Sequence, residues 1–195
     1  MTDAIWPGLP RHSLPGRLYT TLSELRGSIR TACGLNVIDH TDDRYRLNPT
    51  LIDVDLWHLH TAVRHAATAV THTTTAWQAI IDAYPGDLAA GRRWPWLDPL
   101  RERTRRNVID AYVALADTEP DPHRALTLLQ AATRIDPYNT DLHTRVTHTL
   151  TTLGDHDTAT KTRTDFTRRL IEAGLHPTDA PTTATIRNDA ASPSR

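Results

Sequence analysis

The sequence predicts a mainly α-helical protein with one short β-hairpin near its N-terminus. Apolar residues recur at helical spacing through most of the chain, and Pro, Gly and Asp separate one periodic stretch from the next. Two short strand-like segments flank a polar turn near residue 40. With 38% hydrophobic and 23% charged residues, the 195-residue chain has the composition of one globular domain or two small ones.

The N-terminal part predicts a helix followed directly by a hairpin. The helix is expected over residues 13–33, with Ser13 as its N-cap and Gly34 as its stop. Its apolar stripe consists of Leu18, Leu22, Leu25 and Ile29. Strands are expected at 35–38 and 44–47, around a polar turn at 40–43. This is the order of the recognition helix and the wing in a winged-helix domain.

The remainder predicts helices followed by a tail. The helices are expected at 56–70, 75–84, 97–117, 121–135, 140–153 and 155–173. Residues 179–195 contain almost no apolar residue, so a disordered tail is expected there.

Two stretches of the helical part repeat with the 34-residue period of tetratricopeptide units. Such a unit is a helix pair with small residues where the helices cross and a Pro at its end. Ala125, Leu129, Ala132 and Pro137 stand at these spacings, and Ala159 follows Ala125 by one period. The second unit departs from the pattern at Arg163 and Phe166. Together the units predict a tetratricopeptide-like α-helical repeat domain.

Several stretches in fixed order resemble a known family. They are residues 18–26, 44–47, 53–57, 84–88 with Gly91 and Trp94, then 125–126, 136–137 and 170–177. They resemble the bacterial transcriptional activator domain (BTAD) proteins of the actinobacterial antibiotic-regulatory (SARP) type. The resemblance implies the C-terminal part of a winged-helix DNA-binding domain at 1–52 and a bacterial transcriptional activator domain at 53–178.

The predicted recognition helix supplies the candidate DNA contacts. Its outward face is expected to carry Thr20, Ser23, Glu24 and Gly27, and Glu24 opposes phosphate contact. The chain begins at the turn before this helix, so the apolar stripe is expected to lack most of its partner surface. The candidate DNA-binding residues are Arg17, Thr20, Thr21, Arg26 and Arg30 in the helix and Arg44 in the wing.

No motif indicates enzyme chemistry. No two of the 11 His stand three or four apart on one predicted helix, so no metal site is expected. Phosphate-loop and nucleophile-elbow patterns are missing, so neither a cofactor nor catalysis is expected. Cys33, the single cysteine, is expected to be a small buried residue. Without a secretion signal or an apolar run long enough to span a bilayer, a cytoplasmic, non-membrane protein is expected.

Two further patterns have a structural interpretation. The charge run 101–106 is interpreted as the solvated face of a long helix, in preference to a nucleic-acid patch. Trp57, Trp77, Trp94 and Trp96 are expected to pack between helix pairs.

Two functional hypotheses follow. The first is a transcription regulator, or the C-terminal regulatory part of one, with DNA contact through the winged helix and protein contact or self-association through the repeats. The alternative is a protein-interaction module without DNA binding, in which the repeats form the binding surface.

Overall fold

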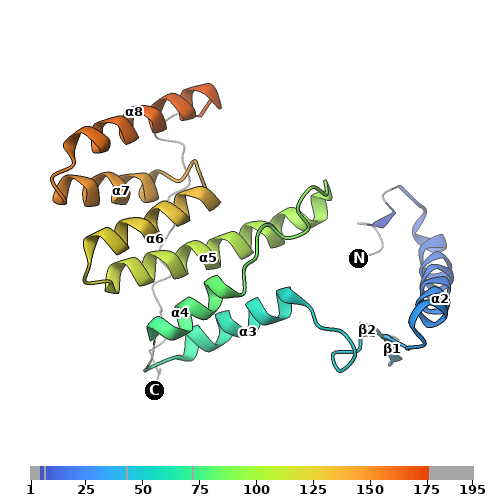
Figure 1. Ribbon diagram of the computed structural model, residues 1–195. Helices are drawn as coiled ribbons and strands as arrows, with labels where there is room; N and C mark the ends of the chain where they lie inside the picture. Colours follow the sequence, from blue (N-terminus) through green and yellow to red (C-terminus); the bar gives the residue numbers. More distant parts are fainter. Residues whose placement is uncertain (1–4, 7, 43, 72, 176–195) are drawn as a thin grey trace, which may run out of the picture. The chain divides into compact units, whose positions relative to one another are not determined.

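The computed structural model describes residues 5–6, 8–42, 44–71 and 73–175, and these are mainly helical with one antiparallel hairpin, as predicted (Figure 1). The predicted tail, 179–195, lies outside the described residues. The elements are η1 (Arg11–Ser13), α2 (Leu14–Cys33), β1 (Ile38–Thr41), β2 (Arg44–Leu47), α3 (Asp55–Thr68), α4 (Thr73–Asp82), η2 (Pro95–Leu97), α5 (Asp98–Thr118), α6 (Pro122–Ile135), α7 (Thr140–Thr152) and α8 (His156–Glu172).

The chain divides into two compact units. Unit 1 consists of residues 1–58 and 93–98, and unit 2 consists of residues 59–92 and 99–195. The first contains α2 and the hairpin, and the second contains most of the helical array. No helix in the described part of the chain is both long and apolar enough to cross a membrane.

Both ends of α2 lie where they were predicted, although the expected side-chain cap is not formed at its start. Gly34 ends the helix with φ 75°, a left-handed conformation that glycine adopts without steric cost. Ser13 stands at the N-cap, but its side chain makes no capping hydrogen bond. The reason is that the 3-10 turn η1 leads into α2, so Ser13 already has a helical backbone, with φ -87° and ψ -16°.

The hairpin begins later than predicted. β1 covers Ile38–Thr41, three residues beyond the expected start, and Thr41 pairs with Arg44. Asp42, directly after β1, has φ 51°, the positive φ that tight hairpin turns favour. Val37 and Ile38 are buried, so the apolar segment leads into the strand instead of forming it alone.

The helix α2 buries little of its apolar stripe. Leu14 is its only buried residue, and Leu25 is 44% exposed although it belongs to the predicted stripe. Gly27, expected to face outward, is half-buried. The prediction that Cys33 is buried is wrong, because this thiol is exposed in the last turn of α2. The periodicity of the sequence identifies the apolar side of this helix. Burial of that side also requires other elements packed against it, and the described residues cover only part of it.

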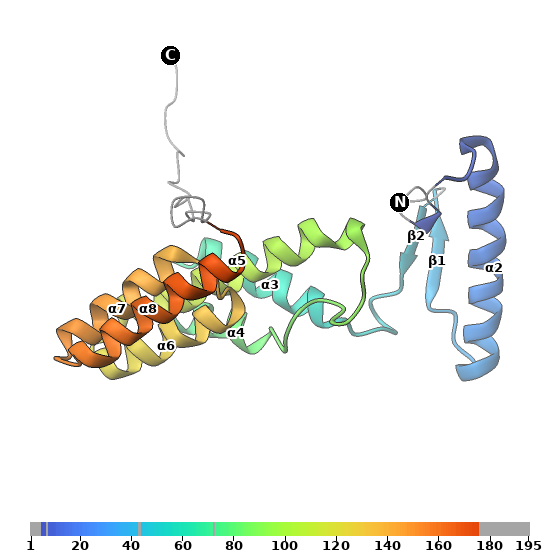
Figure 2. The ribbon, with the colours of Figure 1, turned by 90° about the horizontal axis from the view of Figure 1, so that it is seen from above.

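Unit 2 contains the well-packed core. Figures 1 and 2 show α6, α7 and α8 side by side, in agreement with the contacts between successive helices. One apolar cluster joins four helices through Ala116, Ala125, Leu129, Val146, Leu150 and Ala159. A second cluster joins Ile109, Ala132 and Leu142. The small residues that the repeat pattern singled out lie inside this core, where Ala132 is 0% exposed.

Side-chain caps fix the starts of the last three helices. Asp121, Asn139 and Asp155 each accept a hydrogen bond from a backbone N–H in the first turn of the helix that follows. Asn139 is itself buried, and its Nδ2 donates to Asp136 at 3.3 Å. These caps explain why the predicted and observed helix boundaries agree so closely in this region.

Three of the four tryptophans that were expected to pack between helix pairs are exposed, and Trp77 is half-buried. Trp57, Trp94 and Trp96 are 37%, 45% and 50% exposed. Trp94 and Trp96 stack on each other, with ring centroids 5.8 Å apart, around the short helix η2. Two of these rings therefore contact each other within one short segment of the chain.

Candidate nucleic-acid interface

The structure leaves most of the predicted DNA-binding side chains accessible. Arg17, Thr20, Thr21 and Arg30 are exposed on α2, and Arg44 is exposed at the start of β2. Arg26 is half-buried, as expected for a residue beside the apolar stripe. Both elements belong to unit 1.

The arginines of this set have no carboxylate partner in the described part of the chain. Within the described residues, Arg17, Arg26, Arg30 and Arg44 form no ion pair with a carboxylate. Such guanidinium groups retain all five N–H donors for an external anion. Phosphate oxygens are the acceptors that arginine binds most readily on nucleic acids.

Two features of α2 limit what the set can do. The hydroxyl of Thr20 donates to the carbonyl of Gly16 at 3.0 Å, so its proton is engaged within the helix and only its lone pairs remain for a ligand. Glu24 is exposed in the middle of the helix and repels phosphates. The thiol of Cys33 is engaged in a similar way with the carbonyl of Ile29, at 3.2 Å.

The hairpin adds a residue that the sequence reasoning missed. Arg46 lies two positions after Arg44 and therefore on the same face of β2. It is opposite Asp39 in the strand register, and its Nε lies 3.5 Å from Oδ2 of that carboxylate. The alternation of Arg, Tyr, Arg and Leu in this strand was the available signal. Arg46 is thus paired, whereas Arg44 has no carboxylate partner among the described residues of the hairpin.

The charge run 101–106 at the start of α5 has a role that neither of the two sequence interpretations predicted. Arg101 donates from Nε to the carbonyl of Leu88 at 2.9 Å and from Nη2 to those of Ala89 and Arg92 at 3.0 and 2.6 Å. Its guanidinium group therefore holds the loop between α4 and α5. The run is neither a simple solvated face nor a free basic patch.

A second arginine of the same run fixes the start of this loop. Arg105 donates from Nε to Oδ1 of Asp87 at 2.8 Å and from Nη2 to Oδ2. The hydroxyl of Tyr84 donates to the same carboxylate at 2.9 Å. Farther along the helix, Arg106 pairs with Glu102 at 3.3 Å, so three of the four arginines in the run have intramolecular partners.

The ionisation of this cluster follows its hydrogen bonds. The bond from Arg105 holds the pKa of Asp87 below its ordinary value, against the opposing effect of partial burial. Burial, followed by the bond to Asp87 and its charge, raises the pKa of Tyr84 from 10.0 to about 12. The cluster therefore stays fully formed at neutral pH, as a structural clasp for the loop.

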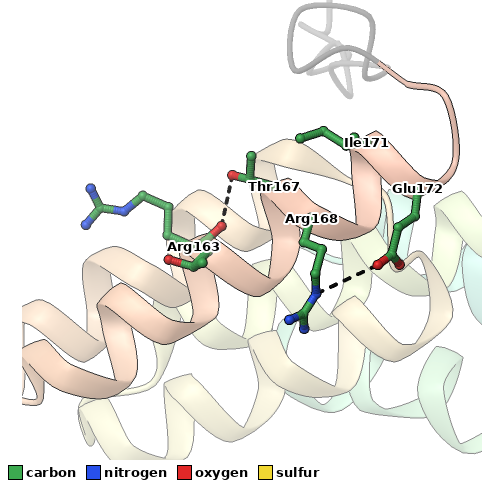
Figure 3. Close-up of a pocket in the computed structure, with 6 residues that line it drawn as sticks. Arg163, Thr167, Arg168, Ile171 and Glu172 are labelled. Carbon is green, nitrogen blue, oxygen red and sulfur yellow. Dashed lines mark hydrogen bonds and ion pairs between the residues drawn. The ribbon is translucent and has the colours of Figure 1, made fainter.

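Two of the surface hollows among the described residues lie in unit 2. One, of about 430 Å³, lies along α8 and is lined by Arg163, Thr164, Thr167, Arg168, Ile171 and Glu172 (Figure 3). The other, of about 480 Å³, lies between α4, α5 and α6. In Figure 3, Arg168 points toward Glu172, its partner at 3.9 Å, and Thr167 bonds to the carbonyl of Arg163. These polar groups are satisfied within the helix itself.

Among the residues with described positions, no group of three or more His, Cys, Asp or Glu is placed to hold a metal ion. No protein-family model, curated protein or solved structure matches the chain. The features of the described residues that bear on function are the exposed arginines of unit 1, which have no carboxylate partner there, and the helical packing of unit 2.

Proposed function

We propose that the protein is a transcription regulator that contacts DNA through α2 and the hairpin, with the fold of a partial winged helix. The observation that carries the proposal is the contrast between the two sets of arginines. Those at the start of α5 are largely consumed by intramolecular bonds, whereas those of α2 and Arg44 have no carboxylate partner in the described structure. Unpaired arginines on one helix and an adjacent hairpin suit phosphate contact.

The charge balance of this segment supports the same proposal. Residues 11–47 contain six Arg and four acidic residues, in a chain whose formal net charge is -1. The segment is therefore a locally basic part of a nearly neutral protein. Since phosphate contact supplies most of the affinity of non-specific DNA binding, a local excess of this kind is the feature that DNA binding requires.

Salt-dependent binding tests the proposal. The full chain is titrated with duplex DNA at two salt concentrations, because each phosphate contact adds about 0.9 to the slope of log affinity against log salt. We expect R17A/R30A/R44A to lower the affinity and to reduce that slope by up to about 3.

The matched control carries the same change of net charge in unit 2, as R103A/R134A/R163A at three exposed positions. We expect this variant to bind DNA as the parent protein does. No binding by the parent chain at low salt, or an equal loss in both variants, would contradict the proposal.

For unit 2 we propose protein contact through a tetratricopeptide-like array. Buried Ala125, Ala132 and Ala159 at the helix crossings support this assignment. Arg145 on α7 also links to Asp117 on α5 at 2.8 Å and to Asp141 at 3.1 Å, so the first helices of successive pairs are joined. Arrays of this kind present extended surfaces to protein partners.

Light scattering of the full chain over a concentration series tests self-association, the simplest form of this contact. We expect a mass above that of the monomer, 21.8 kDa, that increases with concentration. A constant monomeric mass would exclude the self-association form. The contact would then have to be made with a different protein.

A further inference from the structure

His143 occupies the junction of three elements of unit 2. It belongs to α7, and its ring stacks on Phe166 of α8, with centroids 3.9 Å apart and planes at 19°. Its Nε2 lies 3.2 Å from the carbonyl oxygen of Pro137, in the turn after α6. The side chain is half-buried, and Phe166 is only 8% exposed. One imidazole ring therefore joins the last helix to the turn before α7.

The hydrogen bonds define the protonation state that fits this junction. Because a carbonyl oxygen only accepts, Nε2 carries the proton of the neutral ring. Nδ1 is buried and has no hydrogen-bond partner in the described structure. Arg169 of α8 donates to the same Pro137 carbonyl, at 3.4 Å. A second proton on the ring would thus be placed on a buried nitrogen with no acceptor, near an existing cation.

The charges around the ring act in opposite directions. Asp136, in the turn after α6, favours the protonated form, as does the Pro137 carbonyl, whereas Arg169 on α8 opposes it. Burial is the largest influence, and the net result is a lowered pKa for His143. The neutral ring is therefore the form that the packed α7–α8 pair selects.

The contact between His143 and Phe166 is specific to the second repeat unit, because the two units differ in sequence at this position. Phe166 stands at a position where the repeat pattern calls for a small residue, one period after Ala132, which is 0% exposed. In the first unit a small residue lets the helices approach closely. In the second unit an aromatic ring fills the position and packs on His143. The packing of α8 therefore depends on an ionisable residue.

We propose that α8 is pH-gated and detaches from α7 when His143 takes up a proton. The helix packs on α7, and its residues Ala159, Phe166 and Leu170 are all buried. In a repeat array each element depends mainly on its nearest neighbours, and among the described elements α8 packs mainly on α7, so α8 opens without unfolding the other helices. Opening uncovers the apolar side chains of Val146 and Leu150 on α7, which belong to the same cluster as Ala159. This device is independent of the DNA-binding proposal.

Amide hydrogen exchange on the full chain tests the proposal at about pH 7 and about pH 5, on either side of the ordinary histidine pKa. After correction for the intrinsic exchange rate, the protection of α8 is expected to fall several-fold more than that of α6. In H143Q the amide still donates to Pro137 but does not titrate, so α8 is expected to keep its protection at both pH values. The control, H148Q, changes an exposed histidine on the same helix and is expected to respond as the parent does.

Equal loss of protection in α6 and α8, no loss in α8, or the same loss in H143Q would each overturn the proposal. If H143Q does not fold, an NMR titration of the parent protein tests the proposal instead. The NMR titration of the His143 ring is expected to share its midpoint with the shifts of α8 amides. Different midpoints would overturn the proposal.

Discussion

Arg105 on α5 and Asp87 in the loop after α4 form a two-point contact across 18 residues of sequence, with Nε and Nη2 each bonded to one carboxylate oxygen. This contact and the three bonds from Arg101 to backbone carbonyls fix one end of unit 2. The loop carries Gly86 and Gly91 with positive φ, 151° and 77°, and Ala89 with φ 49°. The arginines therefore hold a backbone conformation that residues other than glycine seldom adopt.

Replacement of Asp87 by Asn is expected to lower the free energy of unfolding by about 1 kcal/mol, because the neutral amide loses the charge-assisted bonds and the site is partly exposed. Urea denaturation measures the change. Glu102→Gln, which weakens the exposed pair with Arg106, is the control and is expected to stay within about 0.5 kcal/mol of the parent. Equal effects of the two substitutions would show that the clasp has no special role.

Replacement of Arg101 by Lys is expected to loosen the loop, because a single ammonium group does not reproduce the planar donor fork that reaches three carbonyls. Trypsin provides the measurement, since the loop ends in Arg92 and Arg93, both exposed. Cleavage after these residues is expected to become several-fold faster in R101K. The same substitution at exposed Arg103, on the same helix, is expected to leave the rate unchanged.

Replacement of Ala132 by Leu is expected to destabilise unit 2 by about 1–3 kcal/mol, because the added carbons enter a filled helix crossing. Ala132 is 0% exposed and packs in the cluster with Ile109 and Leu142. Thermal denaturation followed by circular dichroism reports the loss. Gln130→Leu adds an apolar side chain at an exposed position of the same helix and serves as the control. An unchanged melting temperature in A132L would contradict the packing described for α6.

The pKa of Tyr84, raised to about 12 from 10.0, predicts a stability change at high pH. Because the folded value lies above the unfolded one, the contribution is complete below pH 10 and is lost as the pH rises toward 12. Tyrosinate absorbance is expected to show one of the five tyrosines ionising late. Tyr84→Phe should remove this late phase and no other, and its persistence in the variant would assign it elsewhere.

Replacement of Glu24 by Lys is expected to strengthen DNA binding, on the premise that α2 contacts DNA. The exposed carboxylate is replaced by a cation, which is expected to steepen the salt dependence by about 0.9, the value of one further phosphate contact. Glu172→Lys makes the same change of charge on α8 and is expected to have little effect. Equal gains in both variants would indicate attraction by net charge alone.

Helix positions were predictable because their signals are local. The last three helices start within one residue of the predicted positions, since Asp121, Asn139 and Asp155 cap them with side chains that the sequence displays. The first strand was misplaced because an apolar segment of four residues does not reveal whether it pairs or only leads into the paired strand. The register with β2 decided that question.

Exposure was harder to predict, because it depends on what packs against a residue. The pattern that placed Cys33 and Leu25 on an apolar helix face is correct as periodicity, but α2 has too little covering surface to bury them. The tryptophans near η2 follow the same rule, since stacking of Trp94 on Trp96 leaves both rings half accessible.

The sequence by itself determined which arginines of α2 and the hairpin are candidates for DNA contact, because residue type and helical position are both local properties. Only the tertiary structure decided which arginines remain available. Arg101 and Arg105 are as basic in sequence as Arg17 and Arg30, yet the first two meet a loop that returns to α5 and the other two meet no carboxylate in the described structure. The physical reason is that the availability of a charge depends on partners distant in sequence, and these become neighbours only when the chain folds.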